Sequence, residues 1–484
     1  MTQYIKNQIL KYLSHFTVFA LAVGLIFHSC ELNADMKGAH HKPSKSKSKS
    51  KSKSKSKSSF KLPKPPKDSD YYEKGKPSSA KVELGRLLFF DKLLSGNQNI
   101  SCATCHHPSA GSGDQLSLPI GEGGRSLGQE RDTGEALGAV HELVPRNSPD
   151  IFNRGAKEFV SMFHDGRVEN TSKKKKSIKT PAGKNLPRGL DNVLAAQALF
   201  PVTSATEMAG QSGENPIADL AAEEDFEGIW SALSDRLKSV PEYRLLFENA
   251  FPRIKKGKEE ITFAHAGNAI AAFEAHAFRF DNSPFDEYLR GDENAITEDE
   301  KAGMTLFYGK AMCASCHSGP FMTDHQFHAM GMPQLGPGKG HGPGGREDFG
   351  RGGVTGRNRD RYKFRTPSLR NVALTGPWGH NGAFSDLKEV VIHQLDPIET
   401  LAYYDRNQPI LPNRPDLNNM NWKVMDDALA VNQLAGACRV EPVVLDSLEI
   451  DQLVDFLYSL TDLRALDMMY IIPESVPSGL PVDD

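Results

Sequence analysis

Two five-residue motifs of the form Cys-x-x-Cys-His constrain this chain more than any other feature. Cys102-Ala-Thr-Cys105-His106 lies in the first half of the sequence, and Cys313-Ala-Ser-Cys316-His317 lies in the second. Two cysteines at this spacing can form thioethers with a haem, and the adjoining histidine can ligate its iron. The spacing also suits zinc or thiol redox chemistry, but the two motifs are too far apart for one small zinc knuckle. Together they use four of the six cysteines, and we predict a haem c at each.

The first 35 residues have the pattern of an export signal. Lys6 and Lys11 precede an apolar run from Phe16 to Phe27, which is too short for a comfortable membrane span. Cys30 follows this run and could be the lipidated cysteine of a membrane-anchored lipoprotein; the alternative is a signal peptide cleaved nearby. We expect export to the periplasm in either case, since haem c is attached outside the cytoplasm in bacteria.

Residues 36–79 form a linker whose central part, Pro43–Ser59, is an almost strict Lys-Ser repeat. Such a segment has nothing to bury and is predicted to be a disordered tether, with contact to anionic lipid or cell wall as the alternative. Residues 1–80 hold 16 lysines and 5 acidic residues, whereas the rest of the chain holds 42 basic and 56 acidic residues. The body does not combine basic residues with exposed aromatics, so we expect no nucleic-acid partner.

The stretch around the first motif, LGRLLFFDKLLSGNQNISCATCHHP, resembles the bacterial di-haem cytochrome c peroxidases and their MauG-type relatives. Four later stretches resemble the same family in the same order: PRNSPDIFN, FHDGRVEN, FPVTSATEMAG and FRTPSLRNVALTGPWGHNGAFSDLKEVV. The resemblance runs from Lys81 to Asp462. It implies a mainly α protein with few strands and two cytochrome c-like domains, at 80–285 for the first haem and 286–470 for the second, followed by a tail at 471–484.

Within this family, a proline and a glutamate six residues apart lie over the open face of the first haem, and here they are Pro201 and Glu207. The chemistry needs such a carboxylate, because heterolytic cleavage of a peroxide requires a proton to move from one oxygen to the other. An unaligned glutamate is otherwise most often a surface residue. Many relatives also carry a histidine sixteen residues after the first haem histidine, where this chain has Glu122; the first haem would then be open unless His141 closes it.

Three further positions follow from the resemblance. Asn147 matches a residue that helps hold Ca²⁺ between the domains, with the backbone oxygens of Thr375 and Pro377 as partners. His164 replaces the usual tryptophan before Asp-Gly-Arg, which puts rapid electron transfer through that side chain in doubt. The second axial ligand of the second haem is expected near the end of the helix starting at Leu387, where Gln394 occupies the family's position and the neighbouring His393 is the better iron ligand. A methionine from the Gly-rich loop is the remaining alternative.

Local patterns add detail to the expected helices. Helical periodicity is present in Val82–Phe90, Gly189–Phe200 and through 229–290, and Thr297-Glu-Asp-Glu300 is a capping box that opens the helix before the second motif. Ser447–Leu460 is an amphipathic stretch with Ser447 as its expected N-cap. Cys438 has no partner cysteine in either motif and is predicted to be buried as a small apolar residue.

The resemblance implies an enzyme that reduces hydrogen peroxide to water with electrons from a small redox protein, either a cytochrome c or a cupredoxin. Its cofactors would be two haem c groups and a calcium ion. Two alternatives stay open: a MauG-like oxidase acting on a protein or organic substrate, and a non-enzymatic electron-transfer cytochrome. The oligomeric state is open between a monomer and a homodimer.

Overall fold

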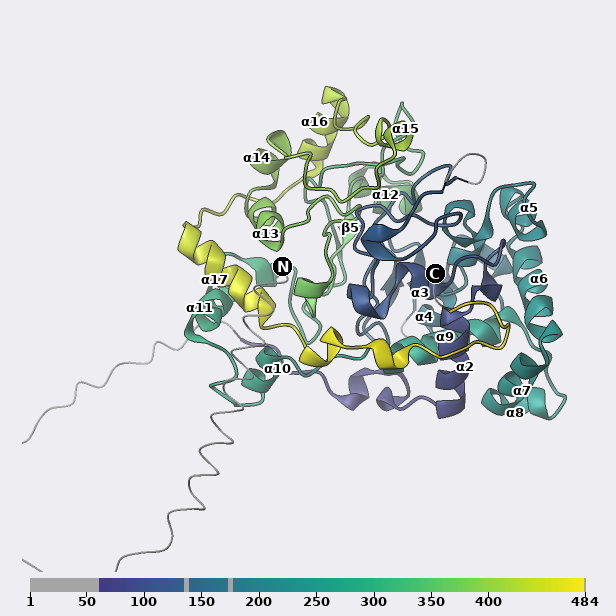
Figure 1. Ribbon diagram of the computed structural model, residues 1–484. Coiled ribbons are helices and arrows are strands. Elements are labelled where there is room, and N and C mark those ends of the chain that lie inside the picture. Colours follow the sequence, from purple (N-terminus) through teal and green to yellow (C-terminus); the bar gives the residue numbers. More distant parts are fainter. Residues whose placement is uncertain (1–60, 135–138, 173–176, 483–484) are drawn as a thin grey trace, which may run out of the picture. The chain divides into compact units, whose positions relative to one another are not determined.

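A computed structural model describes residues 61–134, 139–172 and 177–482 of this chain. The expected export signal, Cys30 and the Lys-Ser repeat lie outside the described residues. The described residues form a single compact unit. No helix among the described residues is both long enough and apolar enough to cross a membrane. The described part is mainly helical, as the sequence predicts (Figure 1).

The strands in the described part of the chain form two short antiparallel sheets, one of three strands and one of two. The helices and strands up to residue 277 are α2 (Ser79–Phe90), α3 (Cys102–Cys105), β1 (Ser161–Met162), β2 (Val168–Asn170), β3 (Ile178–Lys179), α4 (Val193–Gln197), α5 (Pro216–Ala222), α6 (Phe226–Ser239), α7 (Pro241–Ala250), α8 (Pro252–Lys255) and α9 (Phe263–Ala277). Those that follow are α10 (Pro284–Leu289), α11 (Glu298–Tyr308), β4 (Phe327–His328), α12 (Arg351–Thr355), β5 (Phe364–Arg365), α13 (Leu387–Leu395), α14 (Pro397–Ala402), α15 (Pro415–Asn418), α16 (Ala428–Ala437) and α17 (Ser447–Tyr458). β2 pairs with both β1 and β3, and Phe327 of β4 pairs with Arg365 of β5.

The first hydrophobic core is built around the packing of α2 on α9. Leu84, Leu88 and Phe89 of α2 are fully buried, and Phe89 meets Phe273 of α9 with ring centroids 5.3 Å apart. A side chain at Gly85 would run into the carbonyl oxygen of Ala269, 1.9 Å from an ideal Cβ. The glycine therefore allows the two helix backbones to approach closely.

The second hydrophobic core repeats this device with α11 and α17. A Cβ at Gly303 of α11 would lie 1.8 Å from the carbonyl oxygen of Gln452 in α17, and Phe307 packs edge-on against Phe456. The core changes between Phe280, which belongs to the first cluster, and Phe285, which belongs to the second. Each Cys-x-x-Cys-His motif therefore packs against its own core. The first core is built around α2 and α9, and the second is built around α11 and α17.

Two terminal segments run from one core to the other. Leu62 packs against the second core, whereas Tyr71 is buried in the first and donates its hydroxyl proton to Asn153. At the other end, the chain leaves α17 and returns to the first core, where Ile471 and Val476 are buried. The stretch designated a tail in the sequence analysis is therefore packed through its described residues up to 482.

Local signals account for most helix ends. The Thr297 hydroxyl accepts a hydrogen bond from the Glu300 amide, and the Glu300 carboxylate accepts one from the Thr297 amide, which confirms the capping box. The N-cap of α17 is Asp446 and not Ser447, because the Asp446 carboxylate accepts from the Glu449 amide. Helix α4 is shorter than expected. It begins at Val193, because the Asn192 side chain accepts a hydrogen bond from the Ala195 amide and caps the N-terminus of the helix. Cys438 is buried and free, as predicted.

Candidate active site

The first motif lies on α3, a single turn that brings two sulfurs and an imidazole to one place. Cys102, Cys105 and His106 are half-buried, and the intervening Ala103 and Thr104 are buried. The His106 Nδ1 lies 3.0 Å from the carbonyl oxygen of Ser112. Burial lowers the pKa of His106. The ring is thus kept neutral, and a proton on Nδ1 donated to Ser112 leaves Nε2 as the free iron donor.

The second motif has the same histidine arrangement in a more open setting. His317 Nδ1 lies 3.2 Å from the carbonyl oxygen of Met322, and burial lowers the pKa of its imidazole as well. Ala314 is half-buried and Ser315 is exposed, in contrast to their counterparts Ala103 and Thr104. Both histidines therefore have the orientation that a haem ligand needs, but only the second motif has its middle residues near solvent.

Buried cations beside these motifs fit a haem's carboxylates. Arg365 is 6% exposed and donates to the carbonyl oxygens of Phe163 and Thr366. Burial, followed by the charge of Arg154, lowers the pKa of Arg365 to about 9. Arg154 is also buried, and its Nη1 has no hydrogen-bond partner. Asp150 pairs with Arg154 Nη2 at 2.7 Å and offsets part of this positive charge, and haem propionates would supply further anions for two guanidinium groups in a dry interior.

Glu207 lies on a tight turn that follows Pro201. A 3₁₀ turn, Pro201–Thr203, runs into a π-helical turn, Ala205–Ala209, and leaves the Glu207 side chain half-buried. Burial raises the pKa of Glu207 above its usual range; the positive charges of Arg167, Lys339 and Arg146 oppose that shift, in that order. Glu207 is therefore a carboxyl group with a pKa raised by burial, close to cations from three separate segments, and these are properties of an acid–base residue.

An ion network behind this turn connects the two halves of the chain. Arg146 donates from Nε and Nη2 to both oxygens of Asp348, at 2.7 and 2.8 Å, and from Nη1 to Asp165 at 2.6 Å. Asp165 also accepts from Arg167 at 3.3 Å. The sequence analysis did not identify Arg146 or Asp348, because they lie 202 positions apart and no local pattern connects them.

Glu122 is held away from solvent by two asparagines that precede the first motif. Its Oε1 accepts from Asn97 at 2.8 Å and from Asn99 at 2.7 Å, and its backbone amide donates to the carbonyl oxygen of Thr206. Glu122 lines a pocket of about 490 Å³ that also reaches Thr206 and His141. His141 is exposed at that pocket's wall. The position at which many relatives carry a histidine is thus occupied by a fixed carboxylate next to the Glu207 turn.

Comparison with known proteins identifies this arrangement. The family model described as di-haem cytochrome c peroxidase matches residues 79–294. The methylamine utilization protein MauG of Methylorubrum extorquens is 35% identical over 317 residues, which cover 65% of this chain and 68% of that protein. The cytochrome c551 peroxidase of Pseudomonas aeruginosa is 31% identical over 66% of this chain and 72% of its own length. This chain belongs to the di-haem cytochrome c peroxidase and MauG family.

Solved structures agree on the fold. A MauG-like protein associated with microbial copper homeostasis has a TM-score of 0.53 at 25% identity, over 86% of this chain and 97% of that one. The di-haem peroxidase BthA of Burkholderia thailandensis has a TM-score of 0.52 at 20% identity, over 81% and 88%. As a member of this family the chain is an oxidoreductase with two haem c groups, for which His106 and His317, with their neighbouring cysteines, are the candidate attachment sites.

The residues expected to hold calcium lie near the junction of the two family halves. Asn147 is 8% exposed, its backbone amide donates to the carbonyl oxygen of His380, and its side-chain nitrogen donates to the carbonyl oxygen of Leu116. The backbone of Asn147 therefore contacts the chain at His380, a few residues after Thr375 and Pro377. A side-chain amide oxygen and two backbone carbonyls form a donor set of the kind that Ca²⁺ prefers.

His164 and His380 surround the same junction. His164 Nε2 lies 3.1 Å from the carbonyl oxygen of Asn147, and burial, followed by the charge of Arg146, lowers the pKa of His164 to about 3. His380 stacks on Phe364 with ring centroids 3.7 Å apart, and burial lowers its pKa to about 4. Both imidazoles are therefore neutral near pH 7, and His164 serves as a hydrogen-bonded spacer where relatives usually carry an indole.

His393 is fully buried in α13, and both of its ring nitrogens have partners. Nδ1 lies 2.7 Å from the Thr400 hydroxyl, and Nε2 lies 3.0 Å from the carbonyl oxygen of Met330. Ligation of a haem iron through Nε2 requires the contact with Met330 to open, whereas the Thr400 contact could persist as the orienting bond. The neighbouring Gln394, at the family's ligand position, is half-buried. The prediction of His393 as a ligand therefore stays a prediction.

Proposed function

We propose that this protein is a periplasmic di-haem peroxidase that reduces hydrogen peroxide to water with electrons from a small redox protein. The observation that carries the proposal is Glu207, a half-buried carboxyl group with a raised pKa on the turn after Pro201, beside the carboxylate-lined pocket of Glu122. The overall reaction consumes two electrons and two protons for each peroxide and yields two waters. Names of relatives favour this chemistry, since several are cytochrome c peroxidases.

Each part of the site has a task in this proposal. Haem iron at the first attachment site, when bound, supplies the electrons that break the O–O bond. Glu207 accepts a proton from one peroxide oxygen and returns it to the other, which then leaves as water. Pro201 offers no backbone N–H and leaves this relay to the carboxylate. The charges of Arg167, Lys339 and Arg146 oppose the rise of the Glu207 pKa that burial causes, which favours the ionised form that accepts the proton.

The fixed position of Glu122 supports a first site that is accessible at rest. Asn97 and Asn99 hold the Glu122 carboxylate, and Arg131 donates to the carbonyl oxygens of Ile120 and Gly121 in the same loop. A carboxylate is a poorer ferric ligand than an imidazole. We propose that peroxide reaches the first site without a preceding rearrangement of this loop.

The second haem, attached through Cys313 and Cys316 with His317 as ligand, is proposed to receive electrons from the donor and pass them on. We further propose His393 as its second ligand and Ca²⁺ at Asn147, Thr375 and Pro377. A MauG-like oxidation of an organic or protein substrate is the second candidate. It is favoured by the 35% identity to a MauG protein and by the pocket of about 490 Å³ beside Thr206.

Steady-state peroxide consumption tests the proposal. The holoprotein is assayed with pre-reduced cupredoxin or cytochrome c, and oxidation of two donor molecules per peroxide is expected. The control is the same assay without a donor. Peroxide consumption that ignores the donor and is accompanied by oxidation of an organic or protein substrate would favour the MauG-like reaction. Absence of peroxide consumption with any reductant would contradict both.

A further inference from the structure

Residues 61–67, with the sequence KLPKPPK, form a strap on the surface of the second core. Leu62 packs against that core and Pro66 is buried, whereas Lys61, Lys64 and Lys67 are exposed. The strap contains no helix or strand. Proline-rich segments favour the polyproline II conformation with three residues per turn, which directs every third side chain to one side. The sequence therefore presents a row of three lysines to solvent while its apolar residues hold the strap in place.

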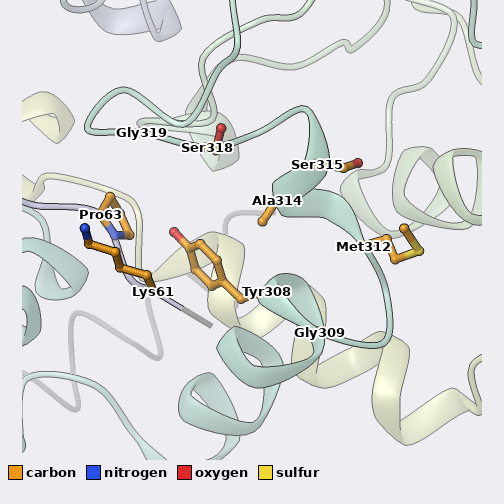
Figure 2. Close-up of a pocket in the computed structure, with 9 residues that line it drawn as sticks. All are labelled: Lys61, Pro63, Tyr308, Gly309, Met312, Ala314, Ser315, Ser318 and Gly319. Carbon is orange, nitrogen blue, oxygen red and sulfur yellow. The ribbon is translucent and has the colours of Figure 1, made fainter. Parts of the chain in front are cut away.

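The strap forms one wall of a pocket beside the second haem attachment site. The pocket has a volume of about 430 Å³ and is lined by Lys61, Pro63, Tyr308, Gly309, Met312, Ala314, Ser315, Ser318 and Gly319 (Figure 2). Ala314 and Ser315 are the two residues between the haem-binding cysteines. Met312 is 63% exposed. Small residues and the exposed Met312 thioether thus form an accessible patch at the second attachment site, whereas Ala103 and Thr104 of the first motif are buried.

Positive charge is concentrated at this end of an otherwise acidic chain. Between Lys42 and Lys67 the sequence has eleven lysines and no acidic residue. Residues 81–484, which follow the strap, contain 42 basic and 56 acidic side chains. A basic segment that ends beside the second motif would attract an acidic protein and repel a basic one.

We propose that the lysine strap and the pocket beside it form the docking site for an acidic electron-donor protein. Lys61, Lys64 and Lys67 would pair with carboxylates around the donor's redox centre. Met312 and the pocket would receive the apolar patch at the centre of the contact, as in interfaces with an apolar core and a charged rim. The inference rests on the proposed function, because it assumes that a small redox protein supplies the electrons.

The test uses the full-length holoprotein with Lys61, Lys64 and Lys67 replaced by serine. Its matched control replaces Lys255, Lys256 and Lys258, three exposed lysines at and after α8, by serine. The probes are a pre-reduced acidic cupredoxin, a basic mitochondrial-type cytochrome c and the small reductant ABTS. Binding of the cupredoxin is measured directly by calorimetry, and turnover is measured at low and high salt.

We expect the strap variant to bind the acidic cupredoxin about tenfold more weakly at low salt, with kcat/KM falling in parallel and the difference vanishing at high salt. The control variant should bind like the wild type. Turnover with ABTS should be unchanged, and the basic cytochrome should react no more slowly than before. Met312→Glu should weaken cupredoxin binding at high salt too, since it places a charge in the apolar centre.

Equal losses in the strap and control variants, or no loss in either, would overturn the docking site. A strap variant that loses binding to phosphatidylglycerol vesicles but keeps its affinity for cupredoxin would assign the lysines to a membrane surface and also overturn it. Failure of the proposed function looks different, since the wild type would then lack peroxide turnover even with ABTS while cupredoxin binding could still be measured.

Discussion

The two Cys-x-x-Cys-His regions share their chemistry and differ in their surroundings. Ala103 and Thr104 in the first motif are 4% and 1% exposed, whereas Ser315 in the second is exposed and Met312 just before it is 63% exposed. Ala103 of the first motif belongs to the first core, which also contains Met208 of the turn that carries Glu207. The second motif opens on the pocket beside the lysine strap. Identical attachment motifs can therefore serve opposite roles, because exposure and neighbouring acid–base groups are set by other parts of the chain.

The largest effect on peroxide turnover is expected from the removal of the Glu207 carboxyl group near the first motif. Glu207→Gln keeps the side-chain shape but cannot accept a proton, and peroxide turnover should fall by about 10²–10⁴-fold. The absorption spectra of both haems should be nearly unchanged. Glu214→Gln is the control, because Glu214 is an exposed carboxylate of the same pocket that also accepts a hydrogen bond from Asn97. Turnover close to that of the wild type in the Glu207 variant would remove this residue from the proposed mechanism.

Calcium removal would test whether the two regions work together. If Ca²⁺ binds Asn147 and the carbonyls of Thr375 and Pro377, chelation with EGTA should lower donor-driven turnover severalfold and added Ca²⁺ should restore it. Asn147→Ala should have low turnover that no longer responds to EGTA. Metal analysis of the purified protein supplies an independent readout. A protein that contains no calcium and ignores EGTA would contradict the site.

Spectroscopy of the second region would decide its axial ligand. We expect low-temperature EPR of the oxidised protein to show one high-spin and one low-spin ferric signal. His393→Ala should convert the low-spin signal and spare the other, because only the second haem would lose a ligand. Gln394→Ala is the matched control on the neighbouring residue. Loss of the low-spin signal in the Gln394 variant instead would show that His393 keeps its bonds to Thr400 and Met330.

The sequence predicts the parts of this molecule that depend on short spacing. The two motifs, the capping box at Thr297 and the position of Glu207 after Pro201 all lie within a few residues of the features that define them. The ion pair of Arg146 with Asp348 joins segments 202 positions apart, and no local sequence pattern around either residue predicts the other as its partner. The contacts of His393 with Thr400 and Met330 show the same limit, since Met330 comes from a distant part of the chain.

The terminal segments show a second reason for incomplete prediction. Residues 61–67 follow the Lys-Ser repeat and are also rich in lysine, a pattern that predicts one continuous linker. The structure shows that Leu62 and Pro66 anchor these residues. Two apolar side chains contribute little to average composition, yet their burial can hold a short extended segment in place. The sequence after residue 470 likewise predicts a tail, because its few apolar residues, such as Ile471 and Val476, are separated by polar residues and prolines.

The smallest expected effect comes from Lys339, which belongs to the second half of the chain but acts on the first region. Its charge lowers the pKa of Glu207, second only to that of Arg167, against the rise caused by burial. Its side chain reaches solvent, so Lys339→Gln should leave the fold intact. Removal of the charge should raise the Glu207 pKa further.

The sign of the resulting pH effect follows from the role of Glu207. The carboxylate must be ionised to accept the peroxide proton, so kcat/KM for peroxide rises with pH as Glu207 loses its own proton. In Lys339→Gln this acid limb should move to higher pH by roughly a few tenths of a unit, because an accessible charge is partly screened. The two profiles should converge at higher pH. Lys256→Gln, on the first half, should leave the limb in place. An acid limb that moves to lower pH, or that moves equally in both variants, would show that Lys339 does not act through Glu207.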